Sequence, residues 1–143
     1  MNSPSRSTIA NCRLVELPKF LDFRGNLTFI EGGAHVPFPL RRTYWIYDVT
    51  GGAARRGHAY RRLEEFVIAL SGSFSVALDD GRKTRSVLLN RSYFGLYIPS
   101  KIWRSFEDFS TNAVCLVLAS LPYEEEDYFR VYEEFRRAKE LEP

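Results

Sequence analysis

The chain has 143 residues, enough for one domain with a substantial hydrophobic core. Its 20 Lys and Arg against 18 Asp and Glu leave a formal charge of +2, which is too balanced to predict nucleic-acid binding. The polar first residues lack the apolar core of a signal peptide, and no apolar run reaches the roughly 18 residues of a membrane span, so we expect a cytoplasmic protein with no membrane partner.

Short strand-like runs separated by turn residues fill most of the chain. Ser73–Leu78 alternates small or polar residues with apolar ones, as a strand with one buried face requires. Asp80-Gly81 then gives a strong hairpin signal. This rhythm predicts one all-β domain, an antiparallel β-sandwich or barrel over about residues 9–120. The predicted strands are Cys12–Leu17, Asn26–Glu31, Arg42–Val49, His58–Arg61, Glu65–Leu70, Ser73–Leu78, Thr84–Leu89, Gly95–Ile98, Ile102–Phe106 and Ala113–Ser120.

The tail has a different pattern, which predicts a C-terminal helix over residues 124–140. Its first turn is acidic, which suits the positive end of a helix dipole. Tyr128, Tyr132 and Phe135 lie three or four residues apart and would form an apolar stripe against the barrel. Basic residues near the end complete the pattern.

The segment that carries most chemistry surrounds His58 and Tyr60. Residues i and i+2 of a strand point to the same face, so these two side chains should project together. Arg56 and Arg62 are in phase with them. A proton-transfer pair among cations suits an anionic substrate whose carbonyl must enolise. The competing interpretation is that Tyr60 is a core aromatic and His58 a structural strand residue.

A series of ordered pieces along the chain matches one known family. The pieces are Asp22–Leu27 with Glu31, Val36–Tyr47, His58 with its flanks, Leu88–Asn90, Gly95–Pro99, Ile102–Trp103, Ala119–Ser120, Tyr123 and Asp127–Arg130. Through them the chain resembles the nucleotide-sugar 3,4-ketoisomerases, WxcM-like enzymes of the cupin superfamily that act on dTDP-4-keto-6-deoxyglucose. The resemblance covers nearly the whole chain, so it implies a single cupin domain over 1–143.

The chain departs from this family at one catalytic position. The family usually carries a His-x-His pair, whereas here His58 is followed two residues later by Tyr60. Two further positions are implied to influence the configuration at C4 of the product, and Arg24 and Arg104 occupy them here. This combination leaves the product configuration open.

The resemblance implies a 3,4-keto shift through an enediol. Histidine has a suitable pKa for a base acting on C3, so His58 is the predicted base. Tyr60 is the predicted acid, or the donor to a substrate oxygen. Arg42 and Arg55 are the candidates for the pyrophosphate, because a guanidinium matches phosphate oxygens. Further substrate contacts are predicted for Tyr44, Trp45, Trp103, Arg24 and Arg104, and for Glu31, which could also orient His58.

No cofactor or metal is expected. One imidazole at the first cupin motif, with no histidine near Trp103, makes a poor transition-metal site. Cys12 and Cys115 lie in separate apolar runs and are predicted to be buried free thiols. The expected partners are a dTDP-linked 4-keto-6-deoxy sugar and a second copy of the chain, because the resemblance implies a homodimer. The alternatives are a 3- or 3,5-epimerase of similar sugars and a non-catalytic nucleotide-sugar-binding module.

Overall fold

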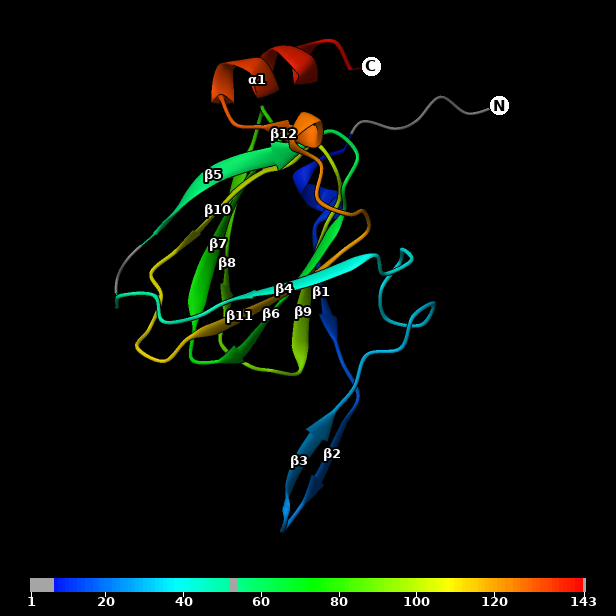
Figure 1. Ribbon diagram of the computed structural model, residues 1–143, viewed down its shortest axis with the longest axis vertical. Coiled ribbons are helices and arrows are strands. Elements are labelled where there is room, and N and C mark those ends of the chain that lie inside the picture. Colours follow the sequence, from blue (N-terminus) through cyan, green and yellow to red (C-terminus); the bar gives the residue numbers. More distant parts are fainter. Residues whose placement is uncertain (1–6, 52–53, 143) are drawn as a thin grey trace.

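Two five-stranded antiparallel sheets face each other in the computed structural model, which describes residues 7–51 and 54–142 (Figure 1). This arrangement confirms the predicted all-β antiparallel fold. The first sheet has the order β1 (Arg13–Glu16), β9 (Phe94–Ile98), β6 (Glu65–Ser71), β11 (Val114–Ala119) and β4 (Arg42–Ile46). The second has the order β12 (Tyr128–Phe129), β5 (Arg55–Tyr60), β10 (Trp103–Glu107), β7 (Phe74–Asp79) and β8 (Thr84–Leu89).

The main hydrophobic core lies between the sheets and follows the two-residue period of the strands. In β7, Phe74, Val76 and Leu78 are buried while the residues between them are partly exposed, as the alternation predicts. Val67 of β6 and Leu96 of β9 meet them from the first sheet. Each such side chain stabilises the fold by about 1.5–3 kcal/mol relative to exposure. The predicted free thiols, Cys12 and Cys115, are both buried.

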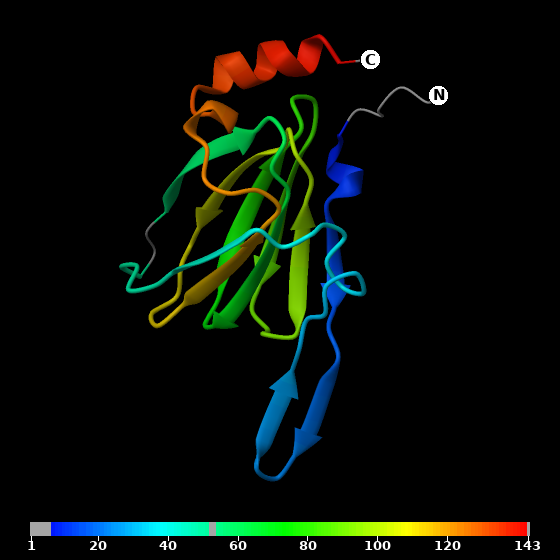
Figure 2. The same cartoon turned by 45° about the vertical axis from the view of Figure 1, so that its right-hand side comes forward.

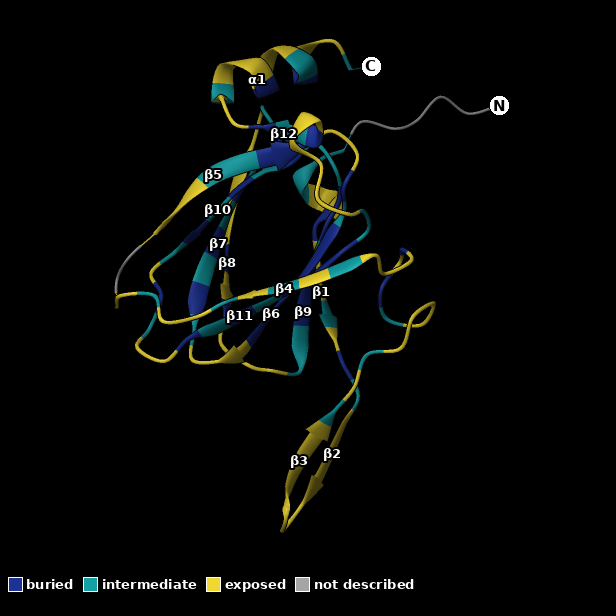
Figure 3. Cartoon of the chain, viewed as in Figure 1, coloured by how far each residue is buried: buried dark blue, intermediate teal, exposed yellow. Residues whose placement is uncertain are grey.

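A two-stranded hairpin projects away from the sandwich, at the end opposite the C-terminal helix (Figures 1 and 2). It consists of β2 (Lys19–Asp22) and β3 (Gly25–Thr28), and the first of these strands was not predicted. Asp22 accepts a hydrogen bond of 2.7 Å from the backbone N–H of Arg24 and closes the turn. The hairpin is exposed along both strands, which Figure 3 colours yellow, and it carries four exposed apolar side chains. They are Phe20, Leu21, Phe23 and Leu27.

The predicted helix over 124–140 is wrong in its first half. Residues Glu125–Asp127 form a 3-10 turn, β12 follows, and the helix α1 covers only Tyr132–Glu140. The buried carboxylate of Asp127 accepts hydrogen bonds from the backbone N–H groups of Arg62 at 2.9 Å and Leu63 at 3.1 Å. These bonds, and the pairing of β12 with β5, hold the segment extended where its local pattern favours a helix.

The remaining helix packs on the second sheet through two of the three predicted residues. Phe135 is buried and Tyr132 stacks on it, with ring centroids 5.8 Å apart. Trp103 of β10 meets both rings edge-on. Tyr128 belongs to β12 instead and lines a cavity in the sandwich. In the part of the chain that the structure describes, no helix has the length and apolarity needed to cross a membrane.

Candidate active site

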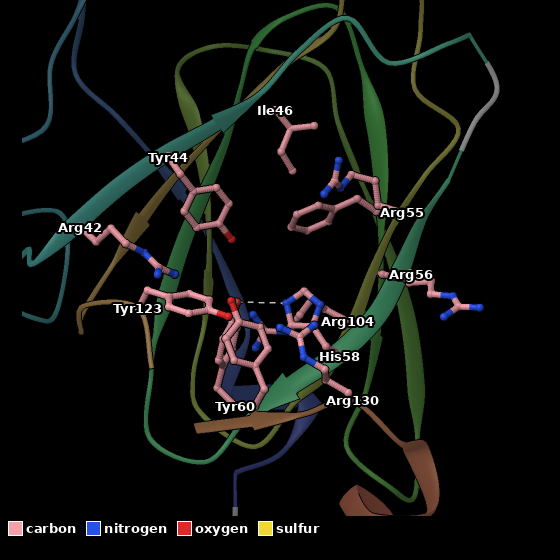
Figure 4. A pocket seen from close by; sticks show the side chains of 13 residues that line it. Arg42, Tyr44, Ile46, Arg55, Arg56, His58, Tyr60, Arg104, Tyr123 and Arg130 are labelled. Carbon is pink, nitrogen blue, oxygen red and sulfur yellow. Dashed lines mark hydrogen bonds between the residues drawn. The ribbon is translucent and has the colours of Figure 1, made fainter. Parts of the chain in front are cut away.

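A cavity of about 450 Å³ opens between β4, β5 and β10 at the mouth of the sandwich (Figure 4). The segment that follows β11 closes one side of it with tyrosine and arginine side chains. Its lining is rich in cations and hydroxyl groups and has few carboxylates, so it favours an anionic, oxygen-rich ligand. The lining residues are Arg42, Tyr44, Ile46, Arg55, Arg56, His58, Tyr60, Arg104, Ser105, Phe106, Tyr123, Tyr128 and Arg130.

His58 and Tyr60 project together into this cavity, as their spacing in β5 predicts. The Nε2 atom of His58 lies 3.1 Å from the Tyr60 hydroxyl, within hydrogen-bond distance, and Figure 4 marks this contact. Tyr60 is buried and His58 half-buried. Gly57 and Ala59, which flank His58, are on the opposite face of β5, and a Cβ atom on Gly57 would lie 2.3 Å from the indole nitrogen of Trp103. Glycine is therefore required there for β5 to approach β10.

The environment of the pair keeps both groups uncharged. Burial lowers the pKa of His58 to about 3, and the positive charge of Arg104 acts in the same direction. A hydrogen bond to the backbone of Arg56 partly opposes these effects. Burial and the carboxylate of Glu65 raise the pKa of Tyr60 above its ordinary value. At neutral pH the site therefore presents a neutral imidazole beside a protonated phenol.

A buried ion pair forms the floor of the cavity. Arg104 of β10 and Glu65 of β6 are both fully buried, and the Nη1 group of Arg104 donates to the Glu65 carboxylate. The same carboxylate accepts a hydrogen bond of 2.6 Å from the Tyr44 hydroxyl. The guanidinium of Arg104 also lies 5.0 Å from the centre of the Tyr60 ring. This network joins both sheets beneath His58 and Tyr60.

Arginines line the open side of the cavity. Arg42 lies against the rings of Tyr44 and Tyr123, at 5.3 and 5.6 Å from their centres, and no described group accepts a hydrogen bond from its buried Nε atom. Arg55 reaches the cavity from the start of β5, and Arg130 enters from the segment after β12 (Figure 4). Together these guanidinium groups form a cationic mouth above the neutral imidazole of His58, and Arg130 is also paired with Glu125 at 2.5 Å.

Comparison with known proteins assigns the chain to a family. The model of the FdtA family, described as WxcM-like, C-terminal, matches residues 10–140. A TDP-4-oxo-6-deoxy-alpha-D-glucose-3,4-oxoisomerase from Aneurinibacillus thermoaerophilus is 38% identical over 125 residues, which are 87% of this chain and 90% of that protein. The chain belongs to the FdtA family.

Solved structures of proteins described as 3,4-ketoisomerases share the fold over nearly the whole chain. The WlaRB TDP-quinovose 3,4-ketoisomerase of Campylobacter jejuni is 40% identical, with a TM-score of 0.86 over 90% of this chain and 99% of its own. A mutant of the 3,4-ketoisomerase QdtA of Thermoanaerobacterium thermosaccharolyticum, in complex with TDP-4-keto-6-deoxyglucose, is 33% identical. Its TM-score is 0.89 over 93% of this chain and 96% of its own.

Two aromatic residues predicted to contact substrate lie outside the cavity of this FdtA-family chain. Trp45 follows Tyr44 in β4, and since successive strand residues point to opposite faces, its ring is on the outer side and 58% exposed. Trp103 precedes the inward-facing Arg104 and packs against α1 for the same reason. The sequence prediction included both members of the neighbouring pairs Tyr44–Trp45 and Trp103–Arg104, but only one member of each pair can face the cavity.

Two charged candidates also lie away from the cavity of their own chain. Glu31 is exposed in the loop after the hairpin, where its backbone N–H donates to the Nδ1 atom of His35 at 2.9 Å, so it does not orient His58. Arg24 is at the tip of the hairpin and forms an ion pair of 2.6 Å with Asp22. Neither position is part of the cavity lining in the described chain.

The site residues that were not predicted as functional include Glu65, Tyr123, Tyr128 and Arg130. Glu65 is in phase with the inward-facing Val67 and Ala69, and this parity is the signal that could have found it. Tyr123, Tyr128 and Arg130 reach the cavity only because the tail folds back along β5. The local pattern around Tyr128 and Arg130 predicts a helix and gives no signal of that position, so the match of Tyr123 and Asp127–Arg130 to the family was the available signal.

The donor groups of the cavity do not resemble a metal site. Among residues 7–51 and 54–142, no cluster of three or more His, Cys, Asp or Glu side chains is arranged to hold a metal ion. His58 has phenol and guanidinium groups as its neighbours. These cationic and neutral neighbours make the cavity better suited to an anion than to a cation.

Proposed function

We propose that the protein is a dTDP-4-keto-6-deoxyhexose 3,4-ketoisomerase, which moves the carbonyl from C4 to C3 through an enediol in deoxysugar biosynthesis. The observation that carries this proposal is the contact between His58 and Tyr60 inside an arginine-lined cavity. The 3,4-oxoisomerase from Aneurinibacillus and the two ketoisomerase structures support the substrate class. The chain is accordingly proposed to be an isomerase that works without a cofactor or metal.

His58 acts on carbon and Tyr60 on oxygen in this proposal. The imidazole is neutral, so it has a lone pair available for the C3 proton. The Tyr60 hydroxyl turns from His58 to the substrate O4 atom and donates to the charge that develops there. Transfer of the proton from His58 to C4, with loss of the O3 proton and return of a proton to Tyr60, completes the shift, and the reaction needs no electron acceptor. Tyr60 therefore takes the duty that a second histidine has in the usual family motif.

Arg42 and Arg55 bind the diphosphate in this proposal. The Nε donor of Arg42 lacks an acceptor among the described groups, and the two rings beside it hold the guanidinium in place. Arg55 lies across the mouth and contributes to the lowered pKa of His58. A bound diphosphate adds negative charge beside Arg55 and so offsets the lowering of the His58 pKa that comes from this guanidinium, while the lowering that comes from burial remains.

We assign the other predicted contacts from their positions. Tyr44 and Arg104 line the cavity and support the pair from below through Glu65. Arg24 can meet a substrate only in the cavity of another molecule, because it lies at the tip of the projecting hairpin. Glu31 and both tryptophans are given no substrate contact within their own chain.

We further propose a homodimer in which the hairpin of each copy packs on the other. Phe20, Leu21, Phe23 and Leu27 are 57–99% exposed, which is unusual for so many large apolar side chains on one small element. Sedimentation velocity should show a dimer for the parent and a monomer for the Leu21→Ser/Leu27→Ser variant at equal concentration. A monomeric parent would contradict this arrangement. We also assign the reaction to the cytoplasm, where buried free thiols such as Cys12 remain reduced.

The test is incubation of the protein with dTDP-4-keto-6-deoxyglucose in D2O, followed by NMR. A ketoisomerase moves the carbonyl to C3 and incorporates deuterium at C3 or C4. Deuterium at C5 without carbonyl migration would instead identify an epimerase. Tight dTDP binding with no exchange would identify a binding module. Full activity after chelator treatment supports metal independence, whereas activity that only added zinc, iron or manganese restores would exclude it.

A further inference from the structure

Tyr128 lies next to the catalytic pair on the paired strand. In the register between β12 and β5, Tyr128 is directly opposite Tyr60, so both side chains point into the cavity. Their hydroxyl oxygens are 3.4 Å apart, and the ring centroids of Tyr128 and His58 are 5.5 Å apart. The guanidinium of Arg130 covers the Tyr128 ring at 4.1 Å. His58, Tyr60 and Tyr128 therefore form a continuous row of proton-carrying groups.

The proposed reaction needs more than one oxygen-side group. The substrate begins with a hydroxyl on C3 and a carbonyl on C4, and the product has these groups exchanged. One proton must therefore leave O3 and another must arrive at O4. Tyr60 is 1% exposed, so bulk water cannot readily restore a proton that it gives away. Two hydroxyls about one hydrogen-bond length apart match the two vicinal oxygens of an enediol.

We propose that Tyr128 is a second oxygen-side catalytic residue, which accepts the O3 proton while Tyr60 serves O4. This inference rests on the proposed ketoisomerase function. In the first half of the reaction, His58 takes the C3 proton, the C3–H electrons form the C3=C4 bond, and the carbonyl electrons move to O4. Tyr60 gives O4 its proton and receives the proton of Tyr128. The enediol then lies between an imidazolium and the Tyr128 phenolate.

The second half restores every group. The Tyr128 phenolate takes the proton of O3, and the O3–H electrons form the new carbonyl at C3. The C3=C4 electrons take the proton from His58 and form the C4–H bond. The product has gained no proton and lost none, and all three side chains return to their starting states. The proton passes between the Tyr128 and Tyr60 hydroxyls across their contact of 3.4 Å, and this transfer links the O3 and O4 atoms of the substrate.

The decisive variant is Tyr128→Phe, which keeps the ring and its contact with Arg130 but removes the hydroxyl. Carbonyl migration should slow by about 10²-fold, the lower range for loss of an acid–base group. Deuterium exchange at C3 requires only that the first half be reversible. Tyr60 can give O4 its proton and take it back without Tyr128, so exchange should stay near the parent rate. The ratio of exchange to migration therefore rises, which a merely structural role of Tyr128 would not produce.

Tyr132→Phe is the matched control, because the Tyr132 hydroxyl donates to Asp79 at 2.8 Å outside the cavity. It should leave both rates unchanged. In Tyr60→Phe/Tyr128→Phe, the losses should be far less than multiplicative, since both residues serve one proton path. Equal slowing of exchange and migration in Tyr128→Phe, or unchanged migration, would overturn the inference. A parent protein that exchanges C3 but moves no carbonyl would overturn the proposed function and this inference with it.

Discussion

The cavity and the β2–β3 hairpin place polar and apolar side chains in opposite environments. Within the cavity, Glu65 and Arg104 are charged and fully buried, and each has a partner. On the hairpin, Phe23 and Leu21 are apolar and 99% and 66% exposed. A buried charge is stable only when it is paired, and a group of large exposed apolar side chains favours association with another protein surface. The ion pair beneath the cavity is thus satisfied within one chain, whereas the apolar side chains of the hairpin have no such cover among the described residues.

The largest expected contrast is between the two histidines of the chain. His58→Asn should reduce C3 proton exchange by about 10⁴-fold, the upper range for an acid–base group, because it removes the proposed base. His35→Asn is the control, since His35 lies in the loop after the hairpin and contacts Phe29 and the backbone of Glu31. NMR in D2O measures both. Comparable losses in the two variants would refute the assignment of His58.

Substitution of Tyr60 tests the oxygen side of the same pair. Tyr60→Phe keeps the buried ring above Arg104 and should slow carbonyl migration by about 10²–10⁴-fold. Tyr60→His restores the usual family pair and should retain or raise the activity. Turnover is compared at matched thermal stability. A Tyr60→Phe variant as fast as the parent would identify Tyr60 as a packing residue.

Substitutions in the cavity floor and in the hairpin should change the free energy of unfolding by different amounts. Glu65→Gln leaves Arg104 buried without a carboxylate, so the free energy of unfolding should fall by about 3–5 kcal/mol. Leu27→Ser on the hairpin should change the unfolding of the monomer by no more than about 0.5 kcal/mol, because Leu27 is already exposed. Urea titration at low protein concentration checks both values. A stable Glu65→Gln variant would show that the ion pair contributes little to the fold.

Removal of one guanidinium should weaken ligand binding by a smaller amount. Arg42→Ala should reduce the affinity for dTDP by about 1.5–3 kcal/mol, which is the range for a hydrogen bond to a charged group. Arg41→Ala removes the same charge one residue away, where the side chain is exposed and is not part of the cavity lining. Calorimetry should show nearly unchanged binding for Arg41→Ala. Unchanged binding in Arg42→Ala would assign that residue to structure.

The smallest expected effect concerns pH. In the free protein His58 is neutral above about pH 3, so kcat/KM should stay level between about pH 8 and about pH 5. An ordinary histidine gains its proton within this range, at about pH 6.5. Bound diphosphate raises the pKa of His58, so the acid limb of kcat should lie at higher pH than that of kcat/KM. Initial rates across this range measure both limbs. A fall of kcat/KM centred near pH 6.5 would contradict the lowered pKa.

The sequence by itself determined most of the strands and the projection of His58 and Tyr60 to one face. The alternation in β7 and the spacing of His58 and Tyr60 depend on the two-residue period of a strand, which is a local property. The same period determines that Tyr44 and Trp45 face opposite sides. It does not say which side is inside, because both residues are large and aromatic. For that reason Trp45 and Trp103 were predicted in the site and lie outside it.

Only the tertiary structure decided the partners of the pair. Glu65 and Arg104 are 39 residues apart and meet because the two sheets face each other. Tyr128 lies opposite Tyr60 because the Asp127 carboxylate binds the backbone of Arg62 and Leu63, which overrides the helical pattern of the tail. Local periodicity carries no information about such long-range hydrogen bonds. The environment that keeps His58 neutral is therefore a property of the assembled fold.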